Sequence, residues 1–579
     1  MLFAKYAVFY KSIFNVVIRE LQLMFIKLWR SSCALALAAF FALFLLLPVG
    51  MVIAEGCSWR IITELWENPV YRGGLLNSFA LALTTTLLVF LLALPLAILS
   101  DSYDFKGKGL WNAMILAPMI LPPFVGALGF QQVFGYYGVL NTLLVDCGLE
   151  RVDFLGGSGK FYAIAFIEAL HLYPILYLNL SAALANCDPA LQEAARNLGI
   201  GKVQRFFKVT LPLIRPGILA GGSLVLIWSF TELGTPLMFG FTRVTPVQVF
   251  DGLSELESNP MPYALVLVMM IAASLLYLAG RVLAGGGGGS SAVKGSSGSV
   301  ARELHGAAAW LPGIVFGIVT ILAILPHIAL LLIAFSRDYY GTVIPGSWTL
   351  MNFENALSDK LVVPSIFNSL RYSLAATLLA TVSGTLCAVL VVRWKPRGAV
   401  FFDVLSMLPL AIPGIVMAFG FLGMTVKFSW AGALFDPVNS PLWLLAGAYA
   451  IRRLPYVMRS VASGLEQTPV VLEEAALSVG APRRKVFSRI LVPLLAANLL
   501  IGGLFAFSFS MLEVSDSLIL VQKSAFYPIT KAIFELSQVL GAGGVTASAF
   551  GVWTMVFMGA ALGAASAILG KKLGALFRF

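Results

Sequence analysis

The sequence predicts an all-α polytopic membrane protein with twelve transmembrane helices in two parallel six-helix repeats. Three observations support this prediction: an apolar composition, twelve apolar segments of spanning length, and motifs that occur twice. Of the 579 residues, 59% are hydrophobic and 12% are charged, whereas a soluble domain has roughly 45–50% apolar and about 25% charged residues. So few charges cannot cover several soluble domains, and a disordered chain would need low hydrophobicity. The composition therefore excludes both classes.

A helix needs about 20 apolar residues to cross the hydrocarbon core of a bilayer. Twelve segments meet this requirement, and they are rich in Leu and Ala without the alternation of barrel strands. The predicted spans are 33–54, 75–99, 110–136, 162–184, 213–241, 263–284, 307–335, 368–392, 400–426, 441–463, 490–521 and 547–570.

The distribution of basic residues predicts the topology. With the N-terminus in the cytoplasm, 28 of the 39 Lys and Arg residues fall in inside segments and 10 in outside loops. Such a bias is the positive-inside pattern, so both termini are expected to be cytoplasmic. The net charge of +11 is explained by these loops, and no nucleic-acid partner is expected. Cys57 and Cys147 fall in external loops, where they either pair or remain two free thiols.

The chain divides into four parts. Residues 1–30 mix basic, aromatic and aliphatic side chains without a small-residue cleavage site, which predicts an interfacial helix on the lipid bilayer. The first half is 31–284 and the second half is 303–579. Between them, 285–302 is rich in Gly and Ser and is predicted to be a flexible, passive tether.

The two halves share residues at constant offsets. Asn77-Ser78 recurs as Asn368-Ser369 and Gly129-Phe130 as Gly420-Phe421, 291 residues later, whereas Pro174 recurs as Pro455, 281 residues later. The change places ten extra residues in an external loop of the first half, where insertions are tolerated. Because each repeat has an even number of spans, both copies enter the membrane in the same orientation, and a pathway is expected between the halves.

The loop between the fourth and fifth spans carries one pattern in both halves. In the first loop, 185–215, it consists of Glu193, Ala194, Ala195, Gly199 and Pro212; in the second, 464–493, it consists of Glu474, Ala475, Ala476, Gly480 and Pro493. Asp188-Pro189 and Thr468-Pro469 are expected to cap a short helix and begin it. Each glycine is expected to end that helix. We call these two cytoplasmic motifs the first knob and the second knob; such knobs suit docking into a groove on a partner.

The pattern E-A-A-x3-G-x9-[IV]-x-[LV]-P resembles the signature of the permease subunits of type I ATP-binding-cassette importers. The resemblance covers the last five spans of each half and implies the type I importer permease fold. It implies that each knob contains a coupling helix that contacts an ATPase subunit, through Glu193, Ala194, Ala195 and Gly199 and through Glu474, Ala475, Ala476 and Gly480.

The same resemblance implies partners and a location. Two copies of an ATPase subunit would bind ATP and Mg, and a periplasmic or extracellular binding protein would deliver the substrate to this chain. The chain itself would lie in the bacterial cytoplasmic (inner) membrane. The chain itself has no G-x4-G-K-[ST] phosphate loop and no zinc-ligand spacing. It is therefore expected to be no enzyme and to hold no cofactor or metal of its own.

The substrate prediction rests on fewer residues. Two permease halves in one chain, with Thr231–Pro236 (TELGTP) and Thr245–Phe250 (TPVQVF), resemble ferric-iron importer permeases. Fused permeases for 2-aminoethylphosphonate or thiamine are built similarly, and a polyamine remains a further alternative within the importer class. An ion-coupled secondary transporter is the alternative outside it, although such a protein needs charged relays in its spans and no duplicated knob.

Ionisable residues within spans are costly and often functional. Glu232 and Glu513 occupy matching positions in the fifth spans, where they either line the path and attract cations or form hydrogen bonds that hold the bundle. Asp516 lies one turn beyond Glu513, where the first half has Thr235. Glu168 and His171, three residues apart, are expected to form a structural pair rather than a proton relay. Prolines, including Pro118, Pro122 and Pro409, are expected to bend the third spans.

Overall fold

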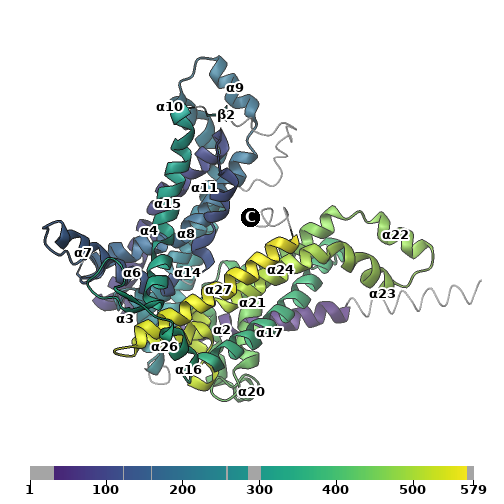
Figure 1. Cartoon of the computed structure of the whole chain (residues 1–579). Coiled ribbons are helices and arrows are strands. Elements are labelled where there is room, and N and C mark those ends of the chain that lie inside the picture. The colour runs from purple at the N-terminus through teal and green to yellow at the C-terminus, as the bar shows by residue number, and fades with distance from the viewer. Residues whose placement is uncertain are drawn as a thin grey trace, which may run out of the picture.

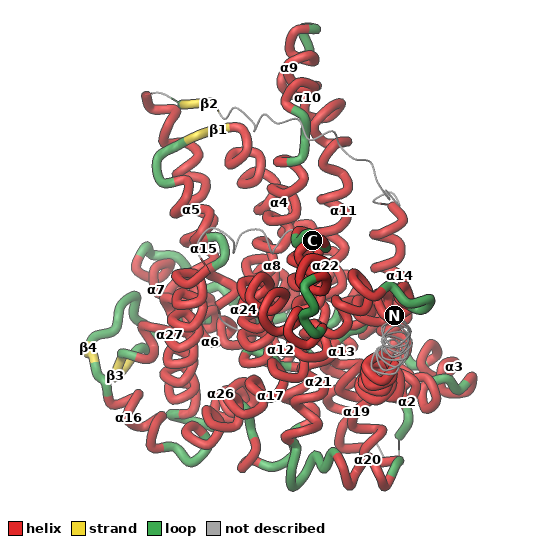
Figure 2. Tube along the Cα trace, turned by 90° about the vertical axis from the view of Figure 1, so that its right-hand side faces the viewer, coloured by secondary structure: helices red, strands yellow, loops and turns green. Residues whose placement is uncertain are grey.

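The computed structural model describes residues 31–120, 123–157, 159–255, 259–283, 302–304 and 306–569. The predicted interfacial helix 1–30, the tether from 285 to 301 and Pro122 lie outside the described residues. The described part is almost entirely helical, as Figure 2 shows. A segment from Ser31 to Gly56 forms the first candidate span.

The helices and strands of the first half follow the order of the sequence. They are η1 (Ala42–Leu46), α2 (Leu47–Gly56), α3 (Trp59–Glu67), α4 (Pro69–Ser102), β1 (Tyr103–Asp104), α5 (Lys108–Met114), η2 (Ala117–Ile120), α6 (Pro123–Phe134), α7 (Val139–Asp146), α8 (Gly159–Ala185), α9 (Pro189–Asn197), α10 (Lys202–Arg205), η3 (Phe206–Thr210), α11 (Leu211–Phe230), α12 (Gly234–Met238), α13 (Thr245–Asp251), η4 (Gly252–Glu255) and α14 (Met261–Leu283).

The second half repeats this order with small differences. Its elements are β2 (Arg302–Glu303), η5 (Gly306–Trp310), α15 (Leu311–Ala334), β3 (Ser336–Asp338), β4 (Ser347–Trp348), α16 (Met351–Ser358), α17 (Val362–Val389), η6 (Leu390–Trp394), α18 (Ala399–Met407), η7 (Leu408–Leu410), α19 (Gly414–Lys427), α20 (Ser429–Leu434), α21 (Leu442–Gln467), α22 (Val471–Ser478), α23 (Arg483–Val486), η8 (Phe487–Leu491), α24 (Val492–Met511), α25 (Ser515–Leu520), η9 (Ser524–Phe526), α26 (Ile529–Gln538) and α27 (Gly543–Leu569). β1 pairs with β2 in parallel and β3 with β4 antiparallel.

The described residues contain nine helices long and apolar enough to span a membrane, or up to 11 if two bent pairs each count as one span. Twelve spans were predicted. The predicted span that is not among these helices is 441–463, which lies within α21. This helix is long enough, but Arg452, Arg453 and Arg459 lie within it. α21 packs between α17 and α24, so its arginines find partners inside the bundle.

The first helix of each half packs against the other half. α2 lies on α19, and α15 lies on α6. Glycine makes both crossings possible: a Cβ on Gly129 would lie 1.9 Å from the Pro326 carbonyl oxygen, and a Cβ on Gly420 would lie 2.3 Å from the Pro48 carbonyl oxygen. The repeated Gly-Phe pair is therefore explained by a close backbone approach, which only glycine permits.

The repeated Asn-Ser pair has a structural role as well. Ser78 Oγ accepts a hydrogen bond of 2.9 Å from the Thr245 amide at the start of α13. Ser369 Oγ accepts one of 2.7 Å from the Ile529 amide at the start of α26. In both halves the second span thus caps a short helix that precedes the sixth span, which satisfies an amide left free at a helix N-terminus.

The third and fifth predicted spans are not straight helices. The third spans bend by 99° between Met119 and Phe124 and by 104° between Leu410 and Gly414, in agreement with the prolines there. The fifth spans break where α11 ends at Phe230 and where α24 ends at Met511, so α12 and α25 follow as separate short helices. These breaks place Glu232 and Glu513 between helices.

Figure 1 shows two arms that diverge from a shared region. α9 lies at the far end of one arm and α22 at the far end of the other. Each arm is a three-helix bundle, formed by α4, α8 and α11 in the first half and by α17, α21 and α24 in the second. Cys57 and Cys147 are both exposed free thiols.

Candidate functional site: two knobs and a buried charge cluster

The first knob is a capped helix that ends in a left-handed glycine. Asp188 Oδ1 accepts a hydrogen bond of 2.9 Å from the Ala190 amide, and Pro189 begins α9, as predicted. Gly199 has φ +77°. The Ile200 amide donates back to the Ala195 carbonyl at 3.1 Å, which is the bond that closes a Schellman turn. The glycine therefore sets the angle between α9 and the following helix.

The second knob has the same C-terminal geometry and a different start. Gly480 has φ +83°, and the Ala481 amide donates to the Ala476 carbonyl at 3.0 Å. The prediction that Thr468 caps this helix is wrong. The Thr468 hydroxyl donates to the Gly464 carbonyl at 2.8 Å, so Thr468 closes α21 instead, and α22 begins at Val471 without a side-chain cap.

The signature residues lie on the surface of both knobs. Glu193, Ala194, Glu474 and Ala475 are exposed, whereas Ala195 is buried and Ala476 is half-buried. Apolar side chains at matching positions are exposed beside them, namely Leu191 (49%) with Leu472 (45%) and Leu198 (80%) with Val479 (85%). Exposed basic residues follow these apolar side chains in the sequence, namely Lys202 and Lys208 in the first knob and Arg483, Arg484 and Lys485 in the second. Exposed apolar side chains within a polar rim are typical of a docking surface.

In the second half, Glu513 and Asp516 belong to a buried charge cluster with Arg452 and Arg453. Arg452 Nη1 donates to Glu513 and also to Asp516 Oδ2, the latter at 3.1 Å. Arg453 Nη2 donates to Glu513 and to the Phe509 carbonyl, the latter at 3.0 Å. Asp516 is completely buried. Both carboxylate oxygens of Glu513 are thus occupied by guanidinium groups.

Arg452 and Arg453 were not among the predicted site residues, because their charges were counted only toward the basic residues of the inside segments. The structure places them near the middle of α21, which ends at Gln467. The available signal was an Arg-Arg pair in an apolar segment of spanning length. A buried arginine needs a charged partner, so Glu513 and Asp516 were the acceptors to seek.

The corresponding site of the first half contains fewer charges. At the offset of 281, Arg452 corresponds to His171, whose Nδ1 lies 3.0 Å from the Pro118 carbonyl oxygen. Glu232 Oε1 accepts a hydrogen bond of 3.3 Å from the Thr235 amide. Glu168 accepts hydrogen bonds from Ser229 and, at 3.2 Å, from Thr85. Glu168 and His171 thus have separate partners, and the predicted pair between them is not formed.

The two sites approach each other at the boundary between the halves. A Cβ on Gly234, at the start of α12, would lie 3.3 Å from Val514 Cγ1 and 3.3 Å from Glu232 Oε1. Val514 follows Glu513 directly. Glu232 and Glu513 are also near enough to interact electrostatically. Glu232 therefore lies near the residue that follows Glu513, and the two matching glutamates have unlike surroundings.

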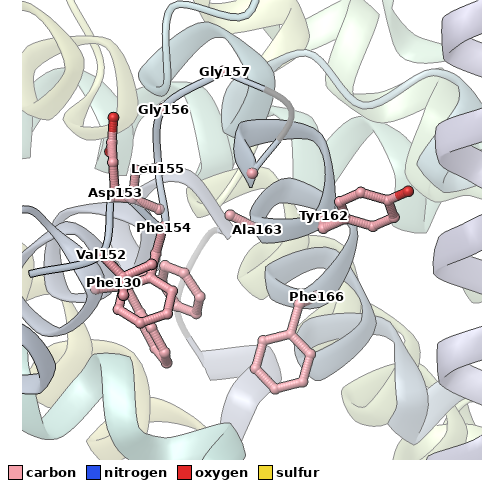
Figure 3. Close-up of a pocket in the computed structure, with 12 residues that line it drawn as sticks. Phe130, Val152, Asp153, Phe154, Leu155, Gly156, Gly157, Tyr162, Ala163 and Phe166 are labelled. Atoms are coloured by element: carbon pink, nitrogen blue, oxygen red, sulfur yellow. The ribbon is translucent and has the colours of Figure 1, made fainter. Parts of the chain in front are cut away.

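A pocket of about 690 Å³ lies in the first half beside the loop with the ten extra residues. Aromatic side chains from α6, from α8 and from the loop itself line it, as Figure 3 shows. The loop residues Val152, Phe154 and Leu155 cover one side, and Asp153 points away from the rings. The pocket thus lies between the inserted loop and the helix bundle, and its lining is mostly apolar.

Comparisons with known proteins agree with this geometry. The family of binding-protein-dependent transport system inner membrane components matches residues 93–285 and 380–574. A putative ferric transport system permease protein of Haemophilus influenzae is 26% identical over 485 residues, covering 80% of this chain and 72% of the relative. A ferric transport system permease protein of Actinobacillus pleuropneumoniae is 26% identical over 479 residues, covering 80% of this chain and 66% of the relative.

A probable molybdenum ABC transporter permease protein of Haloferax volcanii is 29% identical over 250 residues, covering 43% of this chain and 88% of the relative. That relative therefore corresponds to about one half of this chain, as a repeat of two permease units predicts. The family model also matches the chain twice, once in each half, and together the matches cover more than half of it. The chain thus belongs to the family of inner membrane components of binding-protein-dependent transport systems, and it is a permease subunit rather than an enzyme.

Proposed function

We propose that this permease imports ferric iron, delivered by an external binding protein and driven by two copies of an ATPase subunit that hold ATP and Mg. The duplicated knob carries the ATPase part of the proposal, because two surfaces of the same geometry suit two copies of one partner. The names of two relatives that cover most of this chain support the choice of iron.

The knobs are the proposed ATPase contacts. In each knob the glycine turn presents an exposed Glu-Ala pair next to exposed apolar side chains. The distribution of Lys and Arg supports a cytoplasmic location for both termini and both knobs. The two halves, 31–284 and 303–579, act as the two moving bodies, and the segment 285–302 is a passive tether between them.

Transport follows from movement of the two arms. ATP binding draws the ATPase copies together, and the knobs move with them. Because each knob continues through η3 or η8 into the fifth-span helix of its half, a displaced knob tilts a whole arm. Rigid-body rotation of two halves about a shared region is a common form of alternating access.

The path is proposed to pass the region that Glu232 and Glu513 face. Ferric iron is a hard cation that prefers oxygen ligands. Glu513 is neutralised by Arg452 and Arg453, and Asp516 shares Arg452 with it. Among the carboxylates proposed for the path, Glu232 is the one without a guanidinium partner in the described structure, so it is the group best suited to meet a passing cation.

Other solutes of the same importer class remain alternatives, namely 2-aminoethylphosphonate, thiamine and a polyamine. An ion-coupled secondary transporter is disfavoured because the chain belongs to a family of binding-protein-dependent systems. A phosphonate would favour free arginines near the path, and here both arginines of the cluster are occupied by carboxylates.

The experiment replaces the glycines that shape the knobs. Gly199→Val and Gly480→Val should reduce co-purification of the chain with its ATPase subunit, because φ values of +77° and +83° are strained for a β-branched residue. Gly240→Val is the matched control, since Gly240 has φ +58°, has open space around it and lies outside the knobs. Undiminished co-purification in the double variant would overturn the assignment of the knobs.

The substrate is tested separately in vesicles that contain the complex. Uptake of radioactive ferric iron from an iron-loaded binding protein should require ATP. An excess of thiamine, spermidine or 2-aminoethylphosphonate should leave it unchanged. Uptake of one of these solutes, with none of iron, would replace iron as the substrate while leaving the importer class intact.

A further inference from the structure

Arg393 joins three elements of the second half at the cytoplasmic end of the bundle. Its Nε donates to Glu473 Oε1 of the α22 helix at 2.8 Å. Its Nη2 donates to the carbonyl of Leu465 at 2.8 Å and to that of Thr468 at 2.7 Å, both at the end of α21. The Arg393 and Glu473 side chains are only 11% and 18% exposed, so water screens this ion pair weakly.

The backbone around Arg393 is shaped for this contact. Arg393 lies in η6, a π-helical turn that ends α17. The next residue but one, Lys395, has φ +44° and is the one non-glycine residue with positive φ among those described. π-Helical turns and left-handed residues cost free energy and cluster at functional sites. Here they turn the chain at the point where Arg393 reaches α22.

The other end of α17 holds a helix on the opposite side of the membrane. Asn368 donates to the Ala525 carbonyl at 2.9 Å, and Tyr372 donates to the Phe526 carbonyl at 3.0 Å. Ser369 caps α26, as described above. The Thr530 hydroxyl of α26 in turn donates to the Glu513 carbonyl at 2.7 Å. α17 therefore contacts α22 at one end and, through α26, the buried charge cluster at the other.

The residues at the matching positions of the first half differ, and among the described residues they do not form this ion pair. At the offset of 291, Arg393 corresponds to Ser102, and at 281, Glu473 corresponds to Gln192. The Gln192 amide donates within its own knob, to Thr210 Oγ1 at 3.4 Å. α4 also carries Pro95 inside the helix near its cytoplasmic end, whereas the proline of the span Val362–Trp394, Pro364, lies in the first turn of the helix. Proline removes a helical hydrogen bond and bends the helix.

We propose that Arg393 is a positioning residue that fastens the second knob to α17, so that movement of this knob reaches α26 and the charge cluster through one rigid helix. In the first half, the residues at the matching positions, Ser102 and Gln192, form no such ion pair in the described structure, so we expect the first knob to be held to α4 less firmly. The inference rests on the proposed function, because it assigns to the second half the transmission of the movement that the ATPase drives.

The test follows the movement itself and needs no substrate. Hydrogen–deuterium exchange is measured on the complex of the full chain with its ATPase subunit, with and without ATP. In the wild type, ATP should change the exchange of α22 and of α26. In Arg393→Gln, α22 should still respond while the response of α26 is lost. Without ATP, α22 amides should exchange about tenfold faster, because charge-assisted hydrogen bonds that hold the helix are missing.

Three further variants separate this role from general damage. Arg397→Gln is the matched control, an exposed arginine four residues along, and should behave as wild type. Arg393→Lys keeps the charge and should restore part of the α26 response. Ser102→Ala should have no effect, since the first half has no fastening at this position.

The outcomes are distinguishable. A full ATP response of α26 in Arg393→Gln overturns the fastening and leaves the knobs as ATPase contacts. A wild-type complex in which ATP changes neither α22 nor α26, together with intact co-purification of the Gly199→Val and Gly480→Val double variant, overturns the proposed function and the fastening with it. If Arg393→Gln does not fold, Glu473→Gln and Arg393→Lys decide by the same readout.

Discussion

The two halves share one fold and differ in how their interiors are held. In the second half, two arginines and two carboxylates form a buried charge cluster, and Arg393 joins the knob to α17. In the first half, the corresponding residues include His171, Thr235 and Ser102, and hydrogen bonds with backbone groups stand in place of the ion pairs. The two halves therefore share their close helix crossings but differ in their buried charged side chains. This difference allows each half to have its own role in transport.

The largest expected effect comes from breaking the charge cluster. Glu513→Gln leaves two buried guanidinium groups without their shared carboxylate, and breaking a buried ion pair costs about 3–5 kcal/mol. Glu232→Gln, the matched change in the first half, should cost about 1 kcal/mol or less, because the amide oxygen can still accept from Thr235. Chemical unfolding in detergent measures both. Equal losses would contradict the contrast between the halves.

The next effect concerns pH and the helix α26, outside the spans. Burial lowers the pKa of Lys531 to about 8 from its ordinary value of 10.5. The unfolded chain then binds more protons than the folded one between these values, so the free energy of unfolding should rise as the pH rises from 8 to 10.5. Lys531→Met should remove this rise. In the first half, Val247 lies two residues after the capped Thr245, as Lys531 lies two residues after the capped Ile529, so the Val247→Met variant should keep the rise.

A moderate and symmetric effect is expected at the helix crossings. Gly129→Ala and Gly420→Ala each place a methyl group within 2.3 Å or less of a backbone carbonyl oxygen. Each should lower the free energy of unfolding by about 1–3 kcal/mol, the range for overpacking. Gly222→Ala, in open space within α11, should not be destabilising. Very different losses at the two crossings would show that the packing around them differs, although the backbone geometry is alike.

The smallest effect distinguishes the starts of the knobs. Asp188→Ala removes the side-chain cap of α9 and should cost about 1 kcal/mol of local stability. Thr468→Val should leave the N-terminus of α22 unchanged, because Thr468 bonds to Gly464 and not to α22. Exchange of the first-turn amides in each knob measures the difference. Faster exchange at the start of α22 in Thr468→Val would show that Thr468 does cap α22, as predicted from the sequence.

Several features were predictable because they depend on local sequence. The glycine turns at Gly199 and Gly480 and the cap at Asp188 follow from residue type and neighbours alone. The Thr468 cap failed because Asp/Thr-Pro motifs can end one helix as well as begin another, and only the contact with Gly464 decides. Arg452 and Arg453 were misplaced because a count of charges by loop does not show which charges find partners inside a bundle.

The sequence by itself determined the class of the protein, the duplication and the two knobs, because apolar length, charge bias and repeated motifs are properties of the chain. The tertiary structure decided which side chains meet. It showed that guanidinium groups pair with Glu513 and, among the described residues, none pairs with Glu232. It also showed that each first helix lies on the opposite half, and that Arg393, at the end of α17, pairs with Glu473 of α22. The physical reason is that ion pairs and close backbone approaches depend on distances between residues far apart in the chain.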